Sequence, residues 1–184
     1  MKYLVIALAF LWLCMACDSS TSETTSSSDT VSAPVEPTLL SRFSPRLQQV
    51  VNTESGLIRG FTPGQPLDSV MHQETAVLEE DSIDYKGYLL GNTVNTDTNA
   101  LDIRYFFNPK TRVTDSLTID TYEESDSLMK ELANYFTVRF GEPVIKEKKL
   151  LTWNLNNNQI VIRDVGVKLS PGLQVVARKS PKHH

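Results

Sequence analysis

The sequence has only two cysteines, Cys14 and Cys17, and both lie within its first seventeen residues. The rest of the chain therefore cannot form a disulfide bond, a thiolate zinc site or a cysteine nucleophile. A domain without these supports must be stabilised by burial of its core alone. About 145 residues are left for such a domain, which is enough for one of ordinary size.

Signatures of catalysis are also missing. The chain contains no Gly-x-Ser-x-Gly element for acyl transfer and no glycine-rich loop for phosphate binding. His72 is the only histidine before the last two residues, His183 and His184, and a surface position is favoured for it over catalysis. We therefore expect no catalytic residue, no metal site and no cofactor.

Two weaker patterns in the sequence could supply catalytic acids or oxygen ligands for a metal ion. Glu79-Glu80-Asp81 with Asp84 could supply the paired carboxylates of a glycoside hydrolase. Consecutive acids on a strand point to opposite sides, however, so a solvated turn is favoured. The run from Asn95 to Asn99 has the alternating oxygen donors of a calcium loop, but Ala100 and Phe106 stand where that loop needs glycine and glutamate.

Long hydrophobic runs are absent as well. The uncharged run from Tyr3 to Met15 has thirteen residues, whereas a helix needs roughly 20 to cross a hydrocarbon core of about 30 Å. Preceded by Lys2 and followed by the small residue Ala16, this run is typical of a cleavable secretion signal. We assign residues 1–16 to a signal peptide.

The segment Cys14-Met15-Ala16-Cys17 resembles the lipobox of bacterial lipoproteins, in which a small residue precedes a cysteine that receives diacylglycerol. The resemblance implies lipidation of Cys17, with Ala16 at the small position and Cys14 in place of the usual Leu or Val. The alternative is an ordinary signal peptide cleaved near Ala16. Asp18 directly follows Cys17. In some lipoproteins an aspartate at this position resembles an inner-membrane retention signal, while in others acidic residues near the cysteine accompany export to the cell surface.

The next segment has almost no apolar residues. Between Asp18 and Thr38 there are twelve serines or threonines, four acids and no base. Such a composition buries too little surface to offset the entropy of ordering, so residues 17–38 are predicted to form a disordered linker. As a flexible coil it would span about 25 Å, which is enough to lift a domain off lipid headgroups.

From Leu39 onward, hydrophobic periods indicate regular structure. A spacing of three and four predicts a short helix that starts near Pro45, and a second short helix is predicted to start between Thr62 and Gln65. The clearest helix runs from Glu124 to Phe140 and ends at Gly141. Alternating or short apolar runs between turn residues predict strands near 77–78, 85–90, 101–107, 113–122, 144–148, 150–155, 159–164 and 172–178.

The order of these elements is a helix and then three or four strands, twice over. Short turns between successive strands favour antiparallel pairing. We therefore predict one α+β domain over residues 39–180, an antiparallel sheet with helices packed on one face. Two tandem helix-plus-strands units and one continuous sheet both fit this order.

The order is similar to that of the tandem modules in two families, the β-lactamase-inhibitor-protein-like proteins and the outer-membrane-assembly lipoproteins of the SmpA/OmlA type. The similarity rests on the lipobox, on the run from Gly60 to Val70 (GFTPGQPLDSV) before a helix, and on Phe140-Gly-Glu-Pro143 before strands that contain Trp153. Members of these families are not enzymes, so the resemblance implies binding of other proteins through sheet faces and loops.

Charge and aromatic residues add two candidate interaction features. The stretch from Glu54 to Glu131 has fifteen acids and six bases, whereas Arg139 to Lys182 has nine bases and three acids. This asymmetry either steers a partner or places the two signs opposite each other across the fold. Tyr105, Phe106 and Phe107 put aromatics on both faces of one strand, and an exposed patch there would mark a partner site, although burial under a helix is the commoner outcome.

Together these features predict a lipid-anchored lipoprotein of the cell envelope, on the outer membrane, that binds an envelope protein as an accessory or scaffold. Binding of nucleic acid is not expected, because the net charge is −4 and the predicted compartment is wrong. The alternatives are an envelope hydrolase that uses the acids near Glu79, and an inhibitor or immunity-type lipoprotein.

Overall fold

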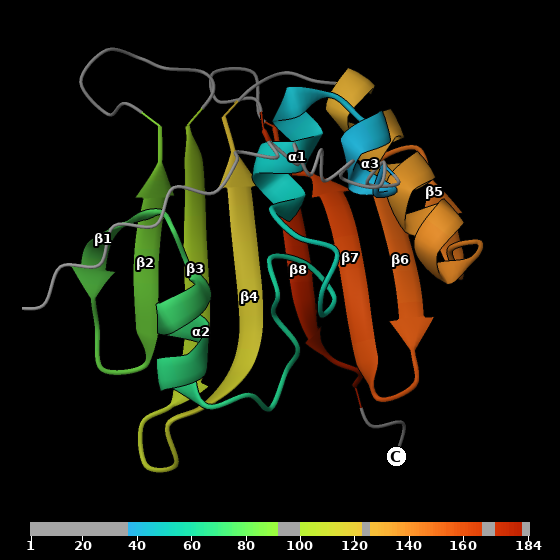
Figure 1. Ribbon diagram of the computed structural model, residues 1–184. Helices are drawn as coiled ribbons and strands as arrows, with labels where there is room; N and C mark the ends of the chain where they lie inside the picture. The colour runs from blue at the N-terminus through green and yellow to red at the C-terminus, as the bar shows by residue number, and fades with distance from the viewer. Residues whose placement is uncertain (1–36, 92–99, 123–125, 167–171, 182–184) are drawn as a thin grey trace, which may run out of the picture. The chain divides into compact units, whose positions relative to one another are not determined.

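The computed structural model describes residues 37–91, 100–122, 126–166 and 172–181 (Figure 1). The signal peptide, Cys17 and the linker up to residue 36 lie outside the described residues, as do the last three residues. None of the helices in the described ranges is long and apolar enough to span a membrane.

The helices begin and end where local chemistry allows it. A short 3₁₀ turn, η1 (Leu40–Arg42), leads to α1 (Pro45–Val51), whose first turn is capped by the Ser44 hydroxyl, which accepts a hydrogen bond from the backbone N–H of Leu47 (3.2 Å). The predicted start at Pro45 is confirmed. Helix α3 (Asp126–Phe140) ends at Gly141, which has a φ of 87°.

Helix α2 (Leu67–Gln73) starts later than the sequence predicted. Residues before Pro66 are not helical because their backbone groups pair with the beginning of a distant strand. The N–H of Thr114 donates to the carbonyl of Gln65 (2.9 Å), and the N–H of Leu67 donates to the carbonyl of Arg112 (2.8 Å). Tertiary pairing thus competes successfully with the local helix signal, and Pro66 lies before the helix rather than inside it.

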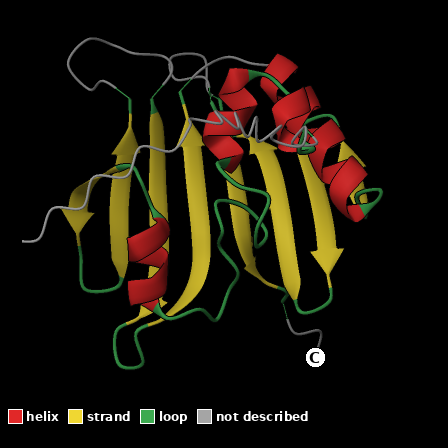
Figure 2. Ribbon diagram, in the orientation of Figure 1, coloured by secondary structure: helices red, strands yellow, loops and turns green. Residues whose placement is uncertain are grey.

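Eight strands form one antiparallel sheet (Figure 2). The strands are β1 (Val77–Asp81), β2 (Tyr85–Leu90), β3 (Leu101–Asn108), β4 (Val113–Thr121), β5 (Ile145–Glu147), β6 (Leu150–Leu155), β7 (Asn158–Asp164) and β8 (Leu173–Lys179). Their order is β1-β2-β3-β4-β8-β7-β6-β5, so two four-stranded meanders meet at their last strands. Helix α2 precedes the first meander and α3 precedes the second, which confirms the predicted α+β class and joins both halves in one sheet.

The helices cover one face of this sheet. On that face, Tyr105, Leu117, Ala177, Ile160 and Trp153 lie side by side on five successive strands from β3 to β6, and all are buried. The predicted stripe of α3 packs here, with the ring of Phe136 centred 5.6 Å from that of Trp153. The indole N–H of Trp153 donates to the carbonyl of Gly141 (2.9 Å), so the end of α3 is fixed to the sheet.

A buried ion pair joins the first half of the sheet to the helices. The Arg59 guanidinium donates to both carboxylate oxygens of Glu74 (2.9 and 2.6 Å), and the Tyr105 hydroxyl donates to the same carboxylate (2.7 Å). Both charged side chains are at most 1% exposed. Burial alone would raise the pKa of Glu74, but the hydrogen bonds and charge of Arg59 outweigh it and hold that pKa below its usual value.

Two acid–arginine pairs involve α2: Asp68 lies within the helix and Glu74 lies at its end. We predict that these two pairs contribute very differently to the free energy of unfolding. Glu74→Ala leaves the Arg59 charge buried without a partner and should lower the free energy of unfolding by about 3–5 kcal/mol. Asp68→Ala removes the partner of Arg112 in a pair whose side chains are 79% and 54% exposed, and should cost less than about 1 kcal/mol. Urea unfolding of both variants measures the difference; equal losses would contradict it.

Candidate functional site

The predicted aromatic patch is divided between the two faces of the sheet. Tyr105 and Phe107 are buried on the helix-covered face. Phe106 lies on the opposite face, half-buried beside Tyr85, with ring centroids 5.6 Å apart. Tyr105 and Phe107 therefore belong to the core, and Phe106 alone is available at the surface.

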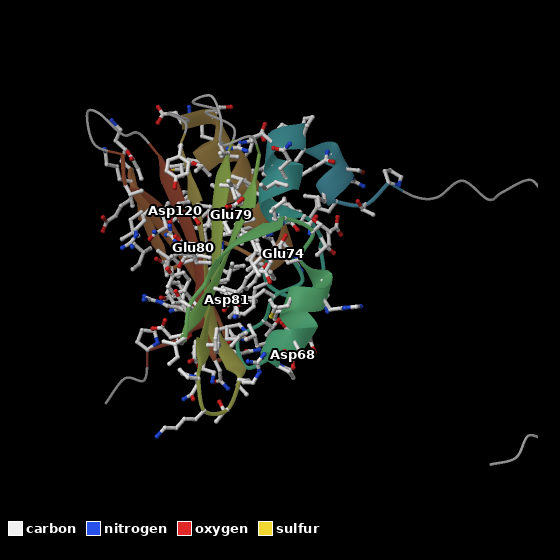
Figure 3. The ribbon with its side chains drawn as sticks, turned by 90° about the vertical axis from the view of Figure 1, so that its left-hand side faces the viewer. Asp68, Glu74, Glu79, Glu80, Asp81 and Asp120 are labelled. Carbon is white, nitrogen blue, oxygen red and sulfur yellow. The ribbon has the colours of Figure 1, made fainter. Side chains whose placement is uncertain are left out.

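The acids from Glu79 to Asp81 are in strand β1 rather than in the predicted turn. Pairing with β2 extends this far because Asp81 lies opposite Lys86 and forms an ion pair with it. The register shifts at Glu79, and all three acids are exposed at the edge of the sheet (Figure 3). Glu79 and Glu80 line a small surface hollow with Asp102, and Glu80 lies 3.9 Å from the guanidinium of Arg104.

The other sequence candidates do not form a metal site in the described part of the chain. His72 is exposed near the end of α2. The calcium-like run from Asn95 to Asn99 and the terminal histidines lie outside the described residues. Within the described ranges, no group of three or more histidines, cysteines or acids is placed to hold a metal ion.

The face of the sheet away from the helices, here called the open face, is organised in rows that cross the strands. The register places small or apolar residues in a central row, with Gly87, Thr118, Val176, Val161 and Thr152 on five of its strands. Arg104 lies in this row between Gly87 and Thr118. Although no helix of the described residues covers them, Gly87, Val161 and Thr152 are buried, and Thr118 and Val176 are half-buried.

Polar side chains flank the central row on one side. Here Asp102, Asp120, Gln174 and Arg163 lie on four adjacent strands, β3, β4, β8 and β7. Arg163 donates to the side-chain oxygen of Gln174 (2.8 Å), and the amide of Gln174 donates to Asp120 (2.7 Å). Arg104 reaches from the central row to Asp120 (3.3 Å) and also forms an ion pair with Asp102. We call this connected set the polar row.

A second line of polar side chains flanks the central row on its other side, over β8, β7 and β6. The guanidinium of Arg178 donates to the side-chain oxygen of Gln159 (3.1 and 2.9 Å), and the amide of Gln159 donates to Asn154 (3.0 Å). Flanking rows on a strand are about 7 Å from the central row, since residues two apart repeat at that distance. Both flanking lines are therefore held in place by hydrogen bonds between side chains.

Asp102 and Asp120 are directly opposite each other on neighbouring strands, which places two negative charges at one position of the sheet. Burial raises the pKa of Asp102, the charge of Arg104 lowers it, and the charge of Asp120 raises it, with a net increase above the usual value. The Tyr122 hydroxyl also donates to Asp102 (3.3 Å). Arg104 thus offsets part of the repulsion that Asp120 exerts on the Asp102 carboxylate.

Sequence reasoning did not identify the open face, although part of the signal was present. The alternation of Asp102 and Arg104 with buried residues shows which side chains leave the core. It does not show that these residues meet Gln174 and Arg163, because β4 pairs with β8 across more than fifty residues of chain.

Comparison of the chain with models of protein families, with curated proteins and with solved structures finds no match. Its function is therefore argued from its own residues.

The polar row predicts a pH-dependent effect of Arg104→Met. Removing the guanidinium leaves two facing carboxylates, so the pKa of Asp102 should rise further and the free energy of unfolding at pH 7 should fall by about 1–2 kcal/mol. Because the pKa of Asp102 is higher in the folded state than in the unfolded state, ionisation of this carboxyl destabilises the folded protein. The loss should shrink as the pH falls through the folded-state pKa.

Urea unfolding at pH 7 and pH 4, with NMR titration of the Asp102 carboxyl, measures this effect. Arg112→Met, which removes an exposed arginine that also pairs with one acid, is the control. A loss of stability in Arg104→Met that stays constant with pH would contradict the role given to Arg104.

Proposed function

We propose that the protein is a lipoprotein of the cell envelope, anchored through Cys17, that binds a protein partner through the open face of its sheet. The observation that carries this proposal is the layout of that face. A central row of small and apolar residues lies between two lines of polar side chains, which is the arrangement of a protein interface with an apolar centre and a polar rim.

The order of the polar side chains supports binding rather than solvation alone. Gln174, Asp120 and Arg104 are fixed by hydrogen bonds and ion pairs before any partner arrives. Long side chains that are already ordered lose less conformational entropy when a partner binds, and their charges are presented in one arrangement. A solvated antiparallel face does not need such a network, because water satisfies each group separately.

The size of the open face is also close to that of a standard protein interface. Eight strands at about 4.8 Å spacing and about 20 Å length give a surface of roughly 770 Å². A standard protein interface covers about 800 Å² on each partner. Attachment to a membrane through Cys17 and the linker would raise the effective concentration of membrane-bound partners, so that a moderate affinity would suffice.

Anchoring is tested by Cys17→Ser. We expect this change to abolish incorporation of radiolabelled fatty acid and to move the protein from the membrane fraction to the soluble fraction after cell lysis. Cys14→Ser is the control and should leave labelling unchanged. Labelling that persists in Cys17→Ser would reject the anchoring site while leaving the binding face untested by this experiment.

Partner binding is tested by mild crosslinking of the membrane-anchored protein in cells, followed by mass spectrometry. Val176→Arg places a long charged side chain in the centre of the open face and should reduce the crosslinked yield of a specific partner at least about tenfold. Val138→Arg makes the same chemical change on the exposed surface of α3 and should leave the yield unchanged.

A partner captured equally by both variants would reject the open face as the binding surface. The identity of a captured partner would also separate two roles. An envelope enzyme that loses activity in the complex would indicate an inhibitor-type lipoprotein, and an assembly component would indicate a scaffold.

A further inference from the structure

The two edges of the sheet carry opposite charges. In the described residues no strand pairs with the outer edge of β1 or of β5. Strand β1 has the exposed acids Glu79, Glu80 and Asp81 and no base, a net charge of −3. Strand β5 and the turn after it have the exposed bases Lys146, Lys148 and Lys149 and one exposed acid, Glu147, a net charge of +2. In Figure 1 these strands stand at opposite ends of the sheet.

Both edges also expose apolar side chains. Val77 and Leu78 of β1 are 65% and 42% exposed. Val144, directly before β5, and Ile145, its first residue, are 60% and 40% exposed. An edge strand with unpaired backbone groups and exposed β-branched residues is a template for pairing with another strand. Charges on an edge strand normally prevent such pairing with an identical edge, because like charges then face each other.

The direction of the strands makes the two edges compatible with each other. Because every neighbouring pair in the eight-stranded sheet is antiparallel, β1 and β5 run in opposite directions. When a second copy is placed beside the first in the same orientation, β5 of one copy therefore meets β1 of the next as an antiparallel pair. A two-fold arrangement would instead pair β1 with β1, acid against acid, or β5 with β5, base against base.

We propose that this protein associates with itself edge to edge, with β1 of one copy pairing with β5 of another to continue the antiparallel sheet. The acids of β1 then lie close to Lys146 of β5 and to the lysines of the turn after it, and the apolar residues of both edges are covered. Copies in the same orientation keep their helices on one side and their open faces on the other. The association thus leaves the open face free, and it does not depend on the proposed partner binding.

Strand β5 has only three residues, so few backbone hydrogen bonds can form across the new pair. The association should therefore be weak, reversible and sensitive to salt. Because each copy keeps one unpaired edge after the first contact, the association is of the heterologous kind and is not limited to dimers.

The experiment uses the full chain in detergent micelles and measures its mass by sedimentation equilibrium between about 1 μM and about 1 mM, the range of weak association. We expect the average mass to rise with concentration at low salt. It should fall toward the monomer at about 1 M salt, where charges are screened beyond about 3 Å.

Two variants test the pairing of unlike edges. Glu79→Lys with Glu80→Lys makes both edges basic, and Lys146→Glu with Lys148→Glu makes both edges acidic. Each variant alone should associate at least about tenfold more weakly than the unmodified protein, and an equimolar mixture should regain association. The mixture also shows that both variants are folded, because a misfolded variant could not restore it.

Matched controls change the same net charge away from the edges, through Asp68→Lys with Asp115→Lys, or Lys110→Glu with Lys179→Glu, all at exposed positions. Their association should equal that of the unmodified protein. A protein that stays monomeric over the whole range would overturn the proposal. So would controls that lose association as fully as the edge variants, or a mixture of folded edge variants that stays monomeric.

Discussion

The fold depends on the buried pair of Arg59 and Glu74. Removing two charges from water costs several kcal/mol for each ion, so the pair is stable only where every remaining hydrogen-bonding group is satisfied. The Glu74 carboxylate also accepts hydrogen bonds from the Tyr105 hydroxyl and from the backbone N–H groups of Thr75 and Ala76. Arg59 also donates to the carbonyl of Gln49 near the end of α1. Four separate segments are thereby held in one arrangement.

The second half of the sheet is joined to the same loop by a different arginine. Arg139 at the end of α3 donates to the carbonyl oxygens of Leu57 (3.0 Å), Gly56 (2.6 Å) and Glu54. The loop between α1 and α2 is therefore attached to α3 through its own carbonyls and to β3 through Arg59 and Glu74. This loop links the helices above both halves. Arg59 has a φ of 52°, and the hydrogen bonds of its guanidinium and of its backbone N–H hold it in this sparsely populated conformation.

The sequence predicted the elements whose signals are local. The four-residue repeat of Leu128, Leu132 and Phe136 identifies α3, and the alternation from Leu101 to Phe107 identifies β3, because both patterns reflect the distance between neighbouring turns or side chains. The predicted start of α2 was wrong, because the backbone of Gln65 pairs with that of Thr114, almost fifty residues away in the chain. The Arg59–Glu74 pair and the polar row were missed for the same reason: each joins residues that no local spacing relates.

The topology also determines where the acidic and basic stretches of the sequence lie in the fold. Acidic and basic residues occupy successive stretches of chain, and each stretch folds into its own contiguous half of the sheet. Had the strands of the two halves alternated, the charges would have cancelled between neighbours. Because the halves meet at their last strands, their first strands are left at the outer edges, with acids along β1 and lysines around β5. A charge dipole therefore runs across the sheet, and it acts within the plane of the open face, where it can orient a charged partner before contact.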